Sequence, residues 1–129
     1  MPRSCRASIS SRALALLATV AAAGSVLPTG ASARSPAYVQ VVEKEFTLTL
    51  SRLKVPPGPV ILQAINFGMD NHDLVIQQNV KGARPIKFRV MAPNERVTKT
   101  LNLAAGSYTL SCSLPGHRSY GMVARLTVR

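Results

Sequence analysis

The sequence predicts an all-β domain, either a sandwich or a barrel, over residues 34–129. Turn signals rich in Gly, Pro and Asn recur at short intervals along this stretch. The segments between the turns are β-branched or otherwise apolar and partly alternate with polar residues. No long apolar repeat with a helical period is found, so no helix is expected. Repeated short strands between such turns are typical of sandwiches and barrels.

Four strands are expected in the first half of the domain. Their turn signals include Pro56–Pro59 and residues 66–71. The run Val60-Ile61-Leu62 indicates a strand that is buried on both faces. The expected strands are Tyr38–Val42, Phe46–Leu50, Val60–Phe67 and Leu74–Gln78.

Four further strands are expected in the second half. Turn signals at Ala104–Gly106 and Pro115-Gly116 mark the last two boundaries. The segment Lys81–Pro93 is irregular, so the strand within it is the least defined. The expected strands are Ile86–Val90, Val97–Leu103, Ser107–Cys112 and Val123–Val128.

Residues 1–33 are expected to be a secretory signal peptide. Three arginines precede the apolar run 13–27, which is shorter than the ~20 residues that span a bilayer. The small-x-small pattern Ala31-Ser32-Ala33 predicts cleavage directly after it. An uncleaved anchor is the alternative. Residues 34–129 are then expected to be a single domain that is periplasmic or secreted.

The predicted mature chain is basic and keeps only one cysteine, Cys112. Loss of the three leader arginines leaves 13 Lys and Arg against 5 Asp and Glu, a net charge of +8. A single exported thiol cannot form an intramolecular disulfide, so it is damaged, dimerised, buried or metal-bound. The sequence contains no GxxxxGK[ST] and no HExxH motif, so nucleotide hydrolysis and zinc-dependent proteolysis have no support.

Four side chains form a candidate metal site. Cys112, His117 and Met122 have the spacing C-x4-H-x4-M in the loop between the last two expected strands. His72 lies 40 positions before Cys112, as suits a ligand from a neighbouring strand. Two imidazoles and a thiolate with a weak axial Met form the donor set of blue-copper electron-transfer sites.

This donor set favours electron transfer over catalysis. Four protein donors leave no obvious open position for a substrate, so an enzyme is not expected. The same ligands could hold Cu(I) in a copper-handling protein that carries or donates copper without a redox role. Zinc binding and a metal-free module are further alternatives. A binuclear copper centre would need a second cysteine in the loop, and residues 113–118 contain none.

The sequence resembles the cupredoxins, the plastocyanin/azurin-like type 1 copper proteins. The resemblance rests on Tyr108–Cys112, Pro115–His117, Gly121-Met122, Asn66-x-Gly68 and His72–Leu74. The loop spacing is most similar to that of the auracyanin and rusticyanin branch. The resemblance implies a Greek-key β-sandwich that carries one type 1 copper ion near one end.

The resemblance also implies roles for the four candidate ligands. His72, Cys112 and His117 would be equatorial ligands, and Met122 would be axial. Copper would then cycle between Cu(I) and Cu(II) in a one-electron carrier that serves redox partners.

Three positions depart from the common pattern of this family. Asp73 stands where many members have Asn, Tyr120 where Ala is frequent, and Ala124 where Gly is frequent. The Asn usually helps to tie the two ligand loops together. Asp73 is expected to accept hydrogen bonds from backbone N–H groups of the Cys112 loop, at Ser113; a simple turn aspartate is the alternative.

The charge of the domain bears on its partners. The basic residues are scattered, and the excess charge would steer the protein toward an acidic redox partner or an anionic membrane surface. Solubility alone is the plainer explanation. Nucleic acid is not an expected partner, and a monomer is expected. Electrons are expected to pass through the His117 edge. The residues expected to surround this edge as a docking patch are Leu114, Pro115, Gly116, Tyr120 and Met69.

Overall fold

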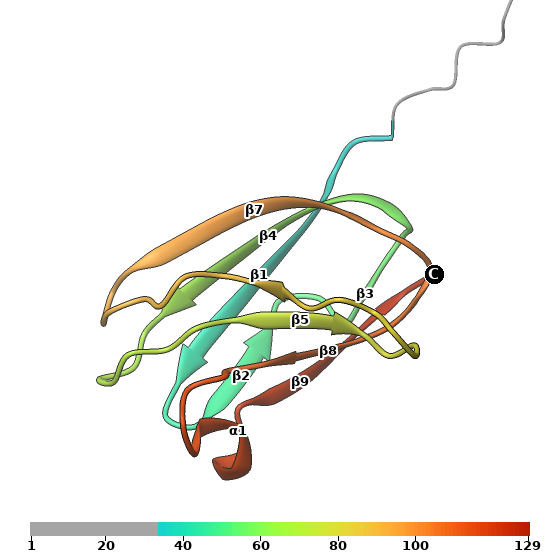
Figure 1. Ribbon diagram of the computed structural model, residues 1–129. Helices are drawn as coiled ribbons and strands as arrows, with labels where there is room; N and C mark the ends of the chain where they lie inside the picture. The colour runs from blue at the N-terminus through green and yellow to red at the C-terminus, as the bar shows by residue number, and fades with distance from the viewer. Residues whose placement is uncertain (1–33) are drawn as a thin grey trace, which may run out of the picture. The chain divides into compact units, whose positions relative to one another are not determined.

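The computed structural model describes residues 34–129, which form a two-layer β-sandwich (Figure 1). Its strands are β1 (Ala37–Lys44), β2 (Thr47–Leu50), β3 (Lys54–Val55), β4 (Gly58–Asn66), β5 (Val75–Gln78), β6 (Ile86–Lys87), β7 (Arg96–Leu103), β8 (Gly106–Ser111) and β9 (Val123–Val128). One sheet has the strand order β2-β1-β4-β7, and the other has the order β3-β9-β8-β5-β6. The expected all-β Greek-key sandwich is confirmed.

The core lies between the two sheets, because apolar residues alternate with polar ones along the strands. Val39 and Val41 of β1 and Leu62 of β4 are fully buried. Burial of one such side chain contributes about 1.5–3 kcal/mol relative to its exposure. Glu43 continues the inward face of β1 and is also fully buried, so the end of β1 places a carboxyl group in the interior.

Strand pairing brings the candidate site residues to one end of the sandwich. β1 and β4 are parallel, and Glu43 pairs with Asn66, so the β1–β2 turn and the loop after β4 leave the sheet together. In the other sheet, Ser111 at the end of β8 pairs with Val75 at the start of β5 and with Val123 at the start of β9. The loop from β4 to β5 therefore meets the loop from β8 to β9 (Figure 1).

The structure differs from the sequence-based expectation at short elements. The two-residue strand β3 was not expected, and it pairs in parallel with β9. Only Ile86–Lys87 of the expected strand Ile86–Val90 is paired. A one-turn helix, α1 (His117–Tyr120), occurs where no helix was expected. Ile61 is half-buried, so the start of β4 is not buried on both faces. A two-residue strand and a single helical turn are too short to show a period.

The expected signal peptide, residues 1–33, lies outside the described residues. Its cleavage after Ala33 and the division into a leader and one domain stay predictions. Within residues 34–129, no helix has both the length and the apolar character needed to cross a membrane.

Candidate metal centre

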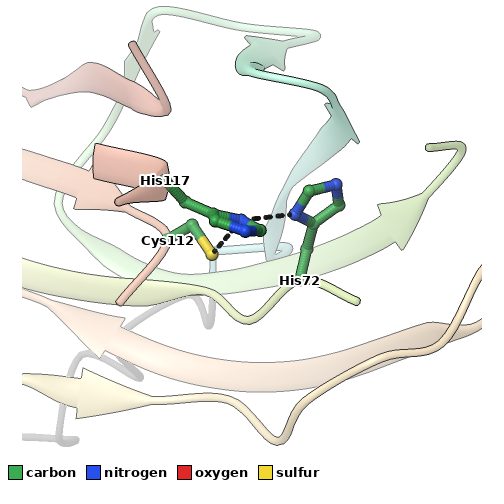
Figure 2. Close-up of side chains that lie close together, drawn as sticks. All are labelled: His72, Cys112 and His117. Carbon is green, nitrogen blue, oxygen red and sulfur yellow. Dashed lines mark hydrogen bonds between the residues drawn. The ribbon is translucent and has the colours of Figure 1, made fainter. Parts of the chain in front are cut away.

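Three of the four predicted ligands meet at one end of the sandwich (Figure 2). The donor atoms of His72, Cys112 and His117 all lie within 4.8 Å of one another. The two Nδ1 atoms of the histidines are 3.1 Å apart, and the Sγ of Cys112 is 3.5 Å from Nδ1 of His117. His72 and Cys112 are fully buried, whereas His117 is half-buried.

The loop after β8 places two of these donors by backbone hydrogen bonds. The N–H of Cys112 donates to the carbonyl of Met122 over 3.2 Å, and the N–H of Met122 donates to that of His117 over 3.1 Å. A turn in which the N–H of His117 donates to the carbonyl of Leu114 over 3.2 Å brings Nδ1 of His117 to 3.5 Å from the sulfur of Cys112. Helix α1 follows as a single turn that starts at His117. Gly116 precedes this turn at φ 82°, a left-handed conformation that favours glycine.

His72 is held by a neighbouring segment of the same chain, at Met91. The two residues form an isolated β-bridge. The N–H of His72 donates to the carbonyl of Met91 with an N–O distance of 3.1 Å, and the N–H of Met91 donates to the carbonyl of His72 with one of 2.7 Å. The Asn66 side chain fixes the loop that leads to His72. Its Nδ2 donates to the carbonyls of Asp70 and Met91 over 2.7 and 3.0 Å, and its Oδ1 accepts the N–H of Gly68 over 2.8 Å.

Asp73 ties the two ligand loops together, as expected. Its carboxylate accepts hydrogen bonds from both the backbone N–H and the hydroxyl of Ser113. The N–H of Asp73 also points at the Sγ of Cys112, at 3.5 Å. The carboxylate thus takes the tying role that Asn usually has in the family that the sequence resembles.

The main chain of Met122 lies beside the three-donor cluster, because it forms backbone hydrogen bonds with both Cys112 and His117. Its side chain is fully buried, yet it is not part of the apolar cluster between the sheets. Met91, by contrast, belongs to that cluster. Met69 is 86% exposed, which agrees with the expected rim position rather than with a ligand.

The β1–β2 turn supplies two site residues that the sequence did not reveal. Oε1 of Glu45 lies 3.2 Å from Nε2 of His72. The rings of Phe46 and His117 meet edge to face, with their centroids 5.1 Å apart. The centroid of the Phe46 ring lies 4.8 Å from that of the Tyr120 ring. No motif marks this turn, which reaches the site only because β1 runs parallel to β4.

Three acidic or thiol groups near the site have shifted pKa values. The backbone N–H of Asp70, with smaller effects from Met69 and His72, lowers the pKa of Glu45 to about 2. Burial, and then the nearby Asp73 carboxylate, raises the pKa of Glu43 to about 8. Burial raises the pKa of the Cys112 thiol, so metal binding there must release a proton.

The donor set fits a copper ion. Donor atoms bound to one ion at about 2.0–2.3 Å lie roughly 3–4 Å apart, and Nδ1 of His117 lies at such distances from Nδ1 of His72 and Sγ of Cys112. Two imidazoles and a sulfur suit copper or zinc, whereas magnesium and calcium prefer oxygen ligands. Among residues 34–129, no carboxylate oxygen joins the cluster of three donors.

Comparison with known proteins agrees with this chemistry. The family described as copper binding proteins, plastocyanin/azurin family, matches residues 36–129. No curated protein sequence matches the chain significantly.

Solved structures share the fold at low sequence identity. Reduced auracyanin from Roseiflexus castenholzii is 18% identical, with a TM-score of 0.58 over 74% of this chain and 99% of that chain. Auracyanin A, a "blue" copper protein from Chloroflexus aurantiacus, is 18% identical, with a TM-score of 0.59 over 73% and 99%. Rusticyanin from Thiobacillus ferrooxidans is 22% identical, with a TM-score of 0.54 over 74% and 79%.

Proposed function

The chain belongs to the plastocyanin/azurin family of copper-binding proteins, and on this premise we propose that it is an exported type 1 copper protein that carries single electrons between redox partners. The observation that carries the proposal is the convergence of two imidazole nitrogens and one cysteine sulfur within 4.8 Å. His72, Cys112 and His117 are the proposed equatorial ligands, and Met122 is the proposed axial ligand.

The surroundings of the donors favour electron transfer. Bound copper would supply the one-electron couple between Cu(I) and Cu(II). The chain holds its donors by backbone hydrogen bonds on Cys112, Met122 and His72, so their positions need little change between the two states. With all four proposed donors supplied by the protein, no position is left open for a substrate, so the proposed role is not enzymatic.

The His117 ring is the proposed route for the electron. It is half-buried, whereas the other proposed ligands are fully buried. Exposed apolar side chains lie in the adjoining loops, with Tyr120 at 68% and Met69 at 86% exposure. Small apolar surfaces of this kind suit the short-lived contacts of redox partners. We expect these contacts to be made in the periplasm or outside the cell.

The experiment that tests the proposal compares Cys112→Ser with the wild-type protein after titration with Cu(II). The wild-type protein should develop the intense visible band of thiolate-to-Cu(II) charge transfer at one copper per chain, and the variant should lack it. A coloured variant would show that the ligand assignment is wrong. Reversible one-electron voltammetry supports a carrier of electrons. Copper transfer to an acceptor without redox turnover would support a copper-handling role instead.

A further inference from the structure

We propose that Glu45 is a positioning residue of the copper site, which sets the tautomer and ring orientation of His72 and holds the loop in front of it. The inference rests on the proposed function, because it takes His72 to be a copper ligand. It concerns a carboxylate from a different part of the chain, 27 residues before His72.

A single carboxylate oxygen collects three donors. Oε1 of Glu45 lies 2.6 Å from the N–H nitrogen of Met69, 2.7 Å from that of Asp70, and 3.2 Å from Nε2 of His72. An ionised carboxylate only accepts hydrogen bonds, so Nε2 of His72 must carry the proton. In the neutral ring, Nδ1 of His72 then keeps a free lone pair, which faces His117 (Figure 2).

This tautomer is the one that a metal ligand needs at Nδ1. Histidine ligands usually donate their second ring N–H to a carboxylate, a carbonyl or water, and that contact fixes the ring. The remaining hydrogen bond between the two rings, at 3.1 Å, then requires Nδ1 of His117 to donate in the metal-free protein. Both rings are thereby ordered before any metal arrives.

Gly68 provides the space for the carboxylate. A Cβ at this position would lie 2.2 Å from Oε1 of Glu45, and the three nearest atoms all belong to Glu45. Gly68 is not among the glycines with positive φ, so its backbone does not require glycine. The absence of a side chain at residue 68 is explained by the close approach of Glu45.

The loop in front of His72 therefore has two anchors. Asn66 holds it from the buried side, and Glu45 holds it from the side where the carboxylate is 27% exposed. The negative charge of Glu45, next to a proposed ligand, also favours Cu(II) over Cu(I), because it attracts the more highly charged ion more strongly.

Two substitutions at Glu45 separate geometry from charge. Glu45→Ala removes both, and we expect the affinity for Cu(II) to fall about 10–100-fold. Glu45→Gln keeps an accepting oxygen, so affinity should change much less. Loss of the charge should raise the Cu(I)/Cu(II) ratio at a fixed potential about tenfold, which is about 59 mV for a one-electron couple.

The matched control is Asp70→Asn, because no side-chain hydrogen bond of the Asp70 carboxylate is found within residues 34–129. The proposal would be overturned by two results together. Asp70→Asn would shift the reduction potential as much as Glu45→Gln does, and Glu45→Ala would bind Cu(II) as tightly as the wild-type protein.

A double-mutant cycle tests the close contact with Gly68. Gly68→Ala alone should displace the carboxylate and weaken Cu(II) binding, as Glu45→Ala does. In the Glu45→Ala background the same change should have little further effect, because the atoms that clash have been removed. Additive losses would show that Gly68 acts independently of Glu45. Thermal unfolding of each metal-free variant separates a folding defect from a site defect.

A measurement on the metal-free protein keeps this inference separate from the proposed function. Long-range ¹H–¹⁵N spectra should show His72 with its proton on Nε2, and the amides of Met69 and Asp70 should exchange slowly. In Glu45→Ala, the His72 tautomer should become mixed and both amides should exchange at least tenfold faster. Unchanged spectra and exchange rates would refute the positioning role even if copper binds. If these results hold but the wild-type protein develops no copper band, the proposed function fails instead.

Discussion

At the scale of single residues, the two buried methionines show how similar side chains differ in their surroundings. Met91 belongs to the apolar cluster between the sheets, whereas Met122 is buried outside it and bonds through its main chain to two proposed ligands. The spacing C-x4-H-x4-M indicated Met122 from the sequence. Its contrast with Met91 is visible only in the fold.

Met122→Leu should raise the reduction potential, because it removes an axial donor and makes the site more apolar, which disfavours the more highly charged Cu(II). We expect a roughly tenfold change in the Cu(I)/Cu(II) equilibrium, about 59 mV. Met91→Leu is the matched control and should leave the potential unchanged at a packing cost below about 1.5 kcal/mol. Voltammetry of the two variants measures the difference. A shift of the same size in both would argue against an axial role for Met122.

Glu43 is the second residue whose surroundings predict a measurable effect. It is fully buried, and within residues 34–129 neither carboxylate oxygen has a hydrogen-bond partner. Burial, followed by the charge of Asp73, raises its pKa from 4.5 to about 8. The folded protein therefore keeps a proton at pH values where the unfolded chain has lost it, so Glu43 makes stability fall as the pH rises.

Glu43→Gln should remove this dependence. In the wild-type protein the contribution of Glu43 to the free energy of unfolding is complete below pH 4.5 and falls by about 1.4 kcal/mol per pH unit until about pH 8. Denaturant unfolding of the metal-free proteins at pH 5 and pH 8 gives the comparison. The variant should lose less stability between these pH values than the wild type. Parallel pH profiles would show that Glu43 titrates normally.

At the scale of elements, the parallel pairing of β1 with β4 determines which turns reach the metal. It brings Glu45 and Phe46 to the two histidines, and no local pattern in the sequence shows that pairing. The strands themselves could be predicted, because inward and outward residues alternate over four or more positions in most of them. β3 and α1 could not, because two and four residues contain no period.

The link between the two ligand loops was predictable in part. The sequence placed Asp73 directly after a proposed ligand and indicated Ser113 as its partner, and the structure has both hydrogen bonds. The sequence could not indicate the closeness of Asp73 to Glu43, because Glu43 lies near the end of β1 and Asp73 in the loop before β5 of the other sheet, so they meet only through packing.

Asp73→Ala should destabilise the metal-free protein by about 1–3 kcal/mol, because it removes the buried carboxylate that accepts both hydrogen bonds from the exposed Ser113. Asp73→Asn keeps an oxygen for the N–H of Ser113 and should cost less. Chemical denaturation of both variants gives the two free energies. Equal losses would mean that the carboxylate charge matters more than the hydrogen bonds that tie the loops.

At the scale of the whole molecule, the excess of basic residues should affect how charged reagents reach the copper. Residues 34–129 carry a net charge of +8, and Arg118 is exposed directly beside His117. The Arg118 guanidinium donates a hydrogen bond to the hydroxyl of Ser111 over 3.3 Å. Lys81 is also exposed, but it follows β5, at the end of that strand away from the ligand loops.

Arg118→Glu should slow oxidation by the anion hexacyanoferrate(III) more than Lys81→Glu does. Both variants change the net charge equally, so the difference between them reports the local field at the His117 edge. We expect a roughly threefold or greater difference at low salt that shrinks as ionic strength rises. Stopped-flow rates at several salt concentrations measure it. Identical rates would place electron entry away from His117.

The central claim is that the same two imidazoles and one thiolate bind copper in both oxidation states. X-ray absorption at the copper edge, on protein loaded with Cu(II) and then reduced, tests it most directly. We predict one sulfur and two nitrogen neighbours in each state, with little change in their distances. A coordination shell without sulfur, or one that loses a nitrogen on reduction, would contradict the account.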